Sequence, residues 1–262
     1  TLFWYTSGNH WVMVLNERDG HSIYTSPDLK SWKYESHVTG FWECPELFEL
    51  AVDGNPNNKK WVMYGATGTY MLGSFDGKTF IPESGKYFYT KGSLYAGQTY
   101  TNIPNSDGRR IQIAWGRISH PSMPFNGMML LPTELTLHTT KEGIRLFSNP
   151  IKETKQLFTP LKKWASLTSD KANDHLKEFR NAETLRIKTT FKLSHATSAG
   201  IDLFGQRILD YDMNANTINS VFYSPEDRNS MELTADIYID KTSIEVFIDG
   251  GIYSYSMGRK AA

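Results

Sequence analysis

The chain has 262 residues, of which 13% are aromatic and 20 are glycine, and its 28 Lys and Arg residues balance its 28 Asp and Glu residues. A formal net charge of zero provides no overall positive charge to steer the chain toward nucleic acid or an anionic membrane. No run approaches the roughly 18 consecutive apolar residues of a membrane helix, and the single cysteine, Cys44, excludes an intrachain disulfide framework.

The first segment, Thr1 to Tyr5, reads as a strand that begins without a turn or polar residues before it. We therefore expect further residues upstream of Thr1. Along the chain, abundant aromatic residues and glycines accompany short apolar runs that are broken by turn dipeptides. This pattern predicts an all-β protein.

The first half of the chain contains an internal repeat of about fifty residues. WVMVL begins at Trp11 and WVMYG at Trp61; SPDLKSW (26–32) then matches SFDGKTF (74–80), and a fainter third copy, IQIAWG, begins at Ile111. A period of this length in a β-rich chain predicts propeller blades. Propellers have roughly four to eight blades, so these copies predict an incomplete propeller over residues 1–150.

The pattern changes after about residue 150. Residues 148–164 carry two prolines and several charges and are expected to form a connection with one short helical turn. LRIKTTFKL (185–193) and SIEVFI (243–248) then alternate apolar and polar residues as half-buried strands do, and a turn is expected at 249–251. We predict a β-sandwich over residues 151–262.

The motifs present favour carboxylate chemistry over other kinds. The sequence has no HExxH pair, no EF-hand loop, no phosphate-binding glycine motif and no GxSxG motif. We therefore expect no metal site and no cofactor. Three glutamates, Glu49, Glu134 and Glu245, fall at outward positions of alternating strands and are expected on solvated faces.

Glu43 is the candidate acid, in the stretch FWECPELFEL (41–50). Phe41 and Trp42 are expected to exclude water from its carboxyl group, and Pro45 to fix the direction of the residues before it. A carboxyl group in such surroundings can protonate a leaving glycosidic oxygen. The alternative is a glutamate at a strand end, paired with an arginine.

These residues also carry a family resemblance. WECP at Trp42 to Pro45 resembles the acid/base motif of glycoside hydrolase family 32, which includes invertases, inulinases and levanases. Further segments resemble this family in the same order: HWVMVL with YTSPDLKSW before the motif, then YAGQTY (95–100), GRRIQIAWG (108–116), PFNGMMLLPTELTL (124–137) and SIEVFIDGG (243–251).

The resemblance implies a five-bladed propeller followed by a β-sandwich, and retaining hydrolysis of terminal β-fructofuranosyl linkages in levan, inulin or sucrose. It implies Glu43 as general acid/base, with Tyr95 and Gln98 lining the sugar pocket, Trp42 shaping its wall and Trp115 facing the funnel or packing within a blade. It also implies a secreted or periplasmic enzyme.

This sequence departs from the family pattern in several places. The nucleophile and stabiliser aspartates belong to WMNDPNG-like and RDP motifs, and neither is present. ERDG (17–20) is expected to be a hairpin turn. Gly92 to Leu94 lack the family's aspartate before Tyr95, and Glu46 replaces the usual aspartate after the proline of the acid/base motif.

Two alternatives stay open. One is a non-catalytic carbohydrate-binding remnant of the same fold, which the missing aspartates favour. The other is a related five-bladed hydrolase of arabinan or xylan. The expected partner is a fructan oligosaccharide or sucrose, with no nucleic acid and no membrane. An unpaired N-terminal sheet edge also predicts self-association or packing against an upstream segment.

Overall fold

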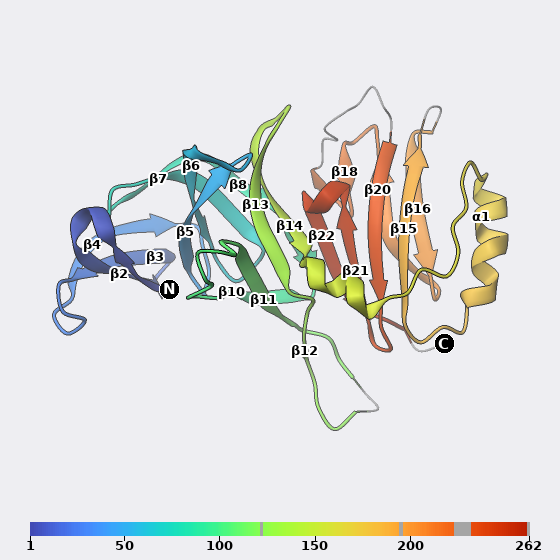
Figure 1. Ribbon diagram of the computed structural model, residues 1–262, viewed down its shortest axis with the longest axis horizontal. Coiled ribbons are helices and arrows are strands. Elements are labelled where there is room, and N and C mark those ends of the chain that lie inside the picture. Colours follow the sequence, from blue (N-terminus) through green and yellow to red (C-terminus); the bar gives the residue numbers. More distant parts are fainter. Residues whose placement is uncertain (121–122, 194–195, 223–231, 261–262) are drawn as a thin grey trace.

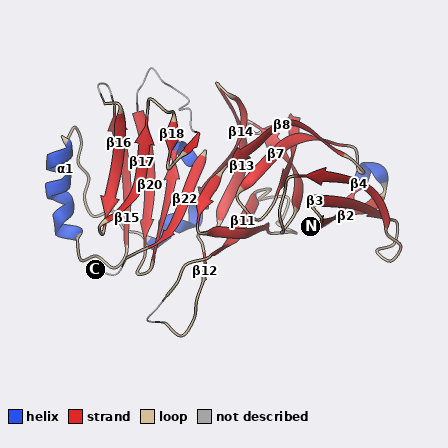
Figure 2. Cartoon of the chain, turned by 180° about the vertical axis from the view of Figure 1, so that it is seen from behind, coloured by secondary structure: helices blue, strands red, loops and turns tan. Residues whose placement is uncertain are grey.

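The computed structural model of the protein describes residues 1–120, 123–193, 196–222 and 232–260. Strands dominate these residues (Figure 2), and this confirms the all-β prediction. The helical segments are short: α1 (Ser169–Leu176) and the 3₁₀ turns η1 (Thr6–Gly8), η2 (Lys152–Leu157), η3 (Lys177–Phe179) and η4 (Asp249–Gly251). Among the described helices, none has the length and apolar character needed to cross a membrane.

The N-terminal region, residues 1–150, is built from antiparallel meanders. The first is a four-stranded sheet of β1 (Leu2–Tyr5), β2 (His10–Glu17), β3 (Gly20–Ser26) and β4 (Lys33–Thr39), paired in chain order. Arg18 and Asp19 form the hairpin turn between β2 and β3, as predicted from ERDG.

A nine-stranded sheet follows. Its first part is the meander β5 (Glu46–Val52), β6 (Asn55–Tyr64), β7 (Thr69–Phe75) and β8 (Phe80–Phe88); its second part comprises β10 (Leu94–Thr99), β11 (Arg110–Gly116), β12 (Met128–Met129), β13 (Thr133–Thr140) and β14 (Gly143–Pro150). A single parallel residue pair, Leu137 with Val52, joins the two parts.

The sequence repeat corresponds to equivalent positions in the first two meanders. Trp11 lies on β2 and Trp61 on β6, each the second strand of its meander. In the turns that follow the third strands, Asp28 and Asp76 each accept hydrogen bonds from the backbone amides two and three residues further along, at 2.7–2.9 Å. The repeated Asp therefore closes the same turn twice.

Hydrophobic clusters lie between successive groups of strands. One joins the first meander to the second through Val14, Ile23 and Met63. Another joins the second meander to the β13–β14 hairpin through Val62 and Leu137. Each group of strands thus buries its apolar face against its neighbour.

In the C-terminal region, residues 151–262, the described strands belong to two sheets, one of which also includes a strand from the N-terminal region. The first is β15 (Leu185–Lys192), β20 (Glu232–Ile239), β21 (Ser243–Ile248), β22 (Tyr253–Gly258) and β9 (Thr90–Gly92); the second is β16 (Ser198–Leu203), β17 (Gln206–Asp212), β18 (Thr217–Ile218) and β19 (Val221–Phe222). Ile237 and Val246 of the first sheet share one core with Ile208 and Ile218 of the second. The strands predicted at 185–193 and 243–248 and the short helical turn predicted in the connection are confirmed.

The two regions are joined by backbone pairing. β9 belongs to the N-terminal region by sequence, yet it pairs in parallel with β22 and forms an edge of the C-terminal sheet. In Figure 1 the N-terminal sheets and the C-terminal sheets lie side by side, with α1 at the far end of the C-terminal region.

The prediction that Glu245 lies on a solvated face is wrong. Its side chain is in β21, in which all six residues are buried, and only 7% of Glu245 is exposed. Ile244, Val246 and Ile248 face the core of the C-terminal region, as the alternation predicts. Glu245 and Phe247 point the other way and are covered by the N-terminal region, because both line a cavity with Leu130 and Thr133.

Candidate functional site

Glu43 lies in the connection between β4 and β5 rather than within a strand. The strand begins only at Glu46, after Pro45, because proline has no amide hydrogen for the sheet. Glu43 and Cys44 both adopt left-handed backbone conformations, with φ of 46° and 42°. Such conformations cost non-glycine residues of order 1 kcal/mol and concentrate at functional sites, so the strained turn supports a site at this position.

Backbone contacts fix this turn on both sides. The amide of Glu43 donates to Oδ1 of Asn16 on β2 at 2.8 Å. The amide of Ala66 donates to the carbonyl groups of Trp42 and Glu43 at 2.9 and 3.1 Å. A Cβ atom on Gly65 would lie 2.8 Å from the carbonyl oxygen of Trp42, so only glycine allows this close approach.

The carboxylate of Glu43 is held by Tyr95 of β10, whose hydroxyl group donates to Oε2. This hydrogen bond raises the pKa of Tyr95. A bulge reorients β10 here: its pairing with β11 shifts between Tyr95 and Gln98, and Ala96 has a φ of 50°. The amide of Ala96 donates to the carbonyl of Ala66 at 3.2 Å, so one backbone network supports both Glu43 and Tyr95.

Aromatic and cationic side chains surround Tyr95. Trp115 of β11 meets the Tyr95 ring edge to face, with ring centroids 6.2 Å apart, and is 46% exposed. The guanidinium carbon of Arg117 lies 4.3 Å from the centroid of the Tyr95 ring. A half-exposed tryptophan beside the tyrosine that holds the carboxylate provides a flat surface on which a sugar ring can stack.

Gln98 and Trp42 flank the turn. The side-chain amide of Gln98 donates to the carbonyl groups of Gly97 at 3.1 Å and Cys44 at 3.5 Å. Trp42 is 54% exposed and therefore does not shield Glu43 from water, contrary to the expectation from sequence. The structure thus brings Tyr95, Gln98 and Trp115 together around the turn that carries Glu43, with Trp42 exposed beside it.

Phe41 forms a buried, apolar part of the same connection. It is 3% exposed and stacks on the fully buried ring of His21, with centroids 5.1 Å apart. Burial lowers the pKa of His21 to about 4. His21 is therefore neutral near pH 7 and supports Phe41 as an uncharged ring.

The remaining groups of the motif are not suited to nucleophilic or metal chemistry. Burial raises the pKa of the Cys44 thiol, which keeps it protonated near neutral pH. Glu46 is 4% exposed, burial raises its pKa, and its Oε2 accepts a hydrogen bond from the Thr99 hydroxyl at 2.7 Å. Within the described residues, no three His, Cys, Asp or Glu side chains are grouped to bind a metal ion.

Sequence reasoning missed Asn16, Ala66 and Arg117. Nothing in the local pattern distinguishes Asn16 or Ala66, because their contacts with the Glu43 turn are long-range. Arg117 had a partial signal: it follows Trp115 by two residues, the spacing at which strand residues share a face, although β11 ends at Gly116.

Comparison with known proteins gives a consistent assignment. Residues 1–150 match the glycosyl hydrolases family 32 N-terminal domain. A levanase of Bacillus subtilis is 31% identical over 301 residues, covering 95% of this chain and 44% of the levanase. An extracellular exo-inulinase of Aspergillus niger is 27% identical over 305 residues, covering 94% of this chain and 56% of the relative. The chain thus spans about half the length of these curated relatives.

Solved structures share the fold. The exo-inulinase from Aspergillus awamori superposes with a TM-score of 0.77 at 20% identity, over 100% of this chain and 61% of the other. Fructan 1-exohydrolase IIa from Cichorium intybus gives a TM-score of 0.71 at 16% identity, over 99% of this chain and 65% of the other.

Proposed function

We propose that this chain, which belongs to glycosyl hydrolase family 32, acts in the retaining hydrolysis of terminal β-fructofuranosyl linkages in levan, inulin or sucrose. The observation that carries the proposal is the Glu43 site: a carboxylate in a strained turn, oriented by Tyr95 and flanked by exposed aromatic rings. The names of the relatives, levanase and exo-inulinase, support the substrate class.

The proposed architecture is part of a five-bladed β-propeller over residues 1–150 and a β-sandwich over residues 151–262. The repeated meanders, with hydrophobic clusters between them, support the proposal of successive blades. The two C-terminal sheets that share one core support the proposal of a sandwich.

Glu43 is the proposed general acid/base. Protonated, it gives its proton to the glycosidic oxygen as the bond to the fructosyl carbon breaks; ionised, it then takes a proton from the water that releases fructose. The Tyr95 hydroxyl orients the carboxyl group through its hydrogen bond to Oε2. Positioning of this kind matters because proton transfer requires an approach within hydrogen-bond distance.

The sugar pocket is proposed to form around this turn. Tyr95 and Gln98 would line it, and Trp42 and Trp115 would offer exposed rings, 54% and 46% accessible, to the apolar faces of sugar rings. A retaining site also needs a second carboxyl group about 5 to 5.5 Å from the first. We propose that residues outside this sequence supply it, because the two aspartate motifs that the resemblance implies do not occur here.

The test is fructose release from levan, inulin and sucrose. Glu43→Gln is compared with Glu49→Gln, a control at a partly exposed glutamate that pairs with Lys59. If the unsubstituted chain hydrolyses fructan, we expect Glu43→Gln to lower kcat by roughly 10²- to 10⁴-fold. We expect Glu49→Gln to leave kcat unchanged.

If the 262-residue chain releases no fructose, the same pair is measured in a chain to whose N-terminus a segment carrying the two aspartate motifs has been added. Full activity of Glu43→Gln there would contradict the acid/base role. Fructan binding without hydrolysis in the extended chain would favour the carbohydrate-binding alternative. Self-association stays a prediction, which a monomer in sedimentation at all concentrations would contradict.

A further inference from the structure

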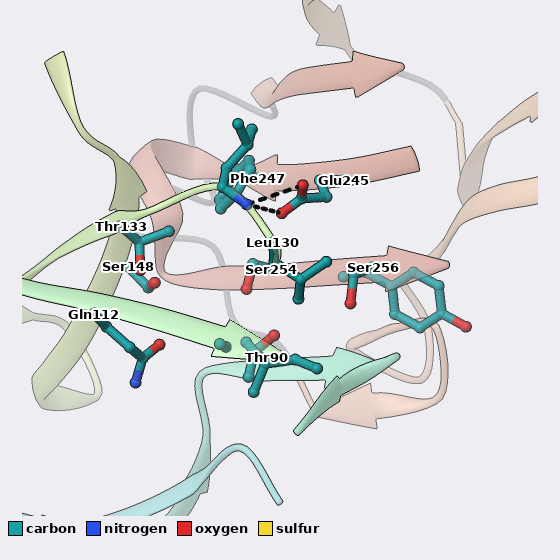
Figure 3. A pocket seen from close by; sticks show the side chains of 13 residues that line it. Thr90, Gln112, Leu130, Thr133, Ser148, Glu245, Phe247, Ser254 and Ser256 are labelled. Carbon is teal, nitrogen blue, oxygen red and sulfur yellow. Dashed lines mark hydrogen bonds between the residues drawn. The ribbon is translucent and has the colours of Figure 1, made fainter. Parts of the chain in front are cut away.

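A small cavity lies where the C-terminal region meets the N-terminal region. Its volume is about 20 Å³, which exceeds the roughly 10–15 Å³ that one water molecule needs. Most of the labelled side chains around it in Figure 3 are polar. They are Thr90, Gln112, Thr133 and Ser148 from the N-terminal region and Glu245, Ser254 and Ser256 from β21 and β22.

Glu245 is the acid in this cavity, and it contacts the N-terminal region directly. The backbone amide of Leu131 donates to both carboxylate oxygens, at 3.1 and 3.2 Å, as the dashed lines in Figure 3 mark. Ser256 lies opposite Glu245 in the pairing of β21 with β22, and its hydroxyl group has no hydrogen-bond partner among the described residues. One amide and one hydroxyl group are thus available to the carboxyl group.

The surroundings favour the neutral form of this acid. Burial raises the pKa of Glu245 to about 7 and outweighs the hydrogen bond from Leu131, which lowers it; Asp240 adds a smaller rise. Of the described residues that line the cavity, none carries a positive charge. The other ionisable groups nearby are Tyr255, which also lines the cavity, and Tyr238, opposite Glu245 on β20. Arg186 stacks on Tyr238, but its guanidinium group is paired with an aspartate of the same sheet.

Leu131 connects this acid to the candidate active site through hydrogen-bonded strands. It follows β12 by two residues, and Met129 of β12 pairs with Trp115 of β11. Trp115 in turn pairs with Tyr95 of β10, whose hydroxyl group holds Glu43. The carboxyl group of Glu245 therefore fixes one end of a continuous path that leads to the acid/base.

We propose that Glu245, supplied by the C-terminal region, is a positioning residue for the candidate active site: it anchors Leu131 and thereby the strands that carry Trp115 and Tyr95. Ionisation strengthens the single hydrogen bond from Leu131, but one amide and one hydroxyl group do not offset the cost of burying the charge. The closed cavity is therefore most stable when the carboxyl group is neutral, and it opens more readily when the group ionises. The role of Glu245 in hydrolysis rests on the proposed function, whereas the hydrogen-exchange test of the anchor does not depend on it.

Amide hydrogen exchange of the full chain tests the anchor, with rates corrected for the intrinsic effect of pH. When the segment around Leu131 opens, the carboxyl group of Glu245 returns to its ordinary, lower pKa, so opening becomes easier as pH rises. Protection of the nearby amides against exchange should therefore fall by about tenfold between pH 6 and pH 8. We expect this in peptides covering 128–131 and, with smaller amplitude, in 94–99 and 110–116, but not in β7.

Glu245→Gln is the neutral isostere, and its side-chain oxygen can still accept from Leu131. It should keep protection high at both pH values. Glu245→Ala should lose protection at both, and Glu134→Gln, on the neighbouring β13, should behave as the unsubstituted protein does. A pH-independent 128–131 segment in the unsubstituted protein, or a response there that does not reach 94–99, would overturn the proposal.

The same variants separate this inference from the proposed function. If fructan hydrolysis is observed, KM should rise between pH 6 and pH 8 in the unsubstituted protein more than in Glu245→Gln. If no hydrolysis is found in any form, the proposed function fails while the exchange result still decides the anchor.

Discussion

The turn around Glu43 and the interface around Glu245 place the same side chain in opposite surroundings. Glu43 is partly exposed, sits in a strained turn outside any strand and is held by a side-chain hydroxyl group. Glu245 is 7% exposed, sits in the middle of a regular strand and is held by a backbone amide. Local strain accompanies the first acid and burial the second.

The difference shows what local sequence can and cannot reveal about an acidic residue. The unusual neighbours of Glu43, an aromatic pair before it and a proline after it, are visible within five residues. The burial of Glu245 depends on residues of the N-terminal region between Thr90 and Ser148, which are far away in the sequence. An alternating strand predicts two faces, but only the rest of the chain determines whether both are covered.

The largest expected effect is on the pH dependence of stability at the interface. The pKa of Glu245 is about 7 in the folded protein and 4.5 as the ordinary value. The folded state therefore holds this proton more tightly, and the free energy of unfolding falls as pH rises from about 4.5 to 7. The loss is at most ~3 kcal/mol above pH 7, from about 1.36 kcal/mol per pKa unit.

Glu245→Gln removes that loss, so at pH 8 it should be more stable than the unsubstituted protein by up to ~3 kcal/mol. Urea unfolding from pH 5 to 8.5 measures it. The difference between the two proteins isolates this group, because His21 and the other titrating residues are common to both. Parallel pH profiles would show that Glu245 titrates normally and would remove the contrast with Glu43.

A second prediction concerns the backbone of the turn that carries Glu43, the candidate active site. Gly65→Ala places a methyl group 2.8 Å from the carbonyl oxygen of Trp42, and overpacking of this kind costs about 2 kcal/mol. We expect lower stability in urea and a displaced Glu43 turn, with fructose release reduced. Gly258→Ala is the control, since its added Cβ atom would meet nothing closer than 3.4 Å. Equal effects of the two substitutions would contradict a specific close approach.

The smallest expected effect tests the hydroxyl group that orients Glu43. Tyr95→Phe keeps the ring beside Trp115 and Arg117 but removes the donor to Oε2. An ordinary hydrogen bond contributes about 1 kcal/mol net, so under the proposed function kcat for fructan should fall by about fivefold. Stability should change little. Tyr100→Phe, at an exposed tyrosine of the same segment, is the control; equal loss of activity in both would argue against positioning by Tyr95.

Much of the fold follows from local patterns. The repeat correctly predicts equivalent positions in the first two meanders. Asp28 and Asp76 each accept a hydrogen bond from the amide two residues further along, so the turn depends on local residues alone. The alternation at 185–193 predicts a strand because one of its faces packs on the C-terminal core. The first signal depends on interactions within one turn, and the second depends on one buried face of a strand.

The contacts that arrange the candidate site could not be predicted from the sequence. WECP identifies Glu43, and the resemblance adds Tyr95 and Gln98, but the partners Asn16 and Ala66 carry no mark in the sequence. They are ordinary residues of separate strands and turns whose role arises from contact across the fold. The exposure of Trp42 was also missed, because the number of aromatic neighbours does not determine which of them is buried.

The parallel pairing of β9 with β22 has a consequence for how the protein is made. Residues 90–92 leave the ribosome long before residues 254–256, and the hydrogen bond between the Ser254 hydroxyl and the Tyr89 carbonyl joins positions 165 residues apart. Contacts of such long range are slow to form because the loop between them must close first. During synthesis β9 therefore stays unpaired with β22 until the C-terminal residues have been made. We expect the pairing of these two strands to be among the last steps of folding.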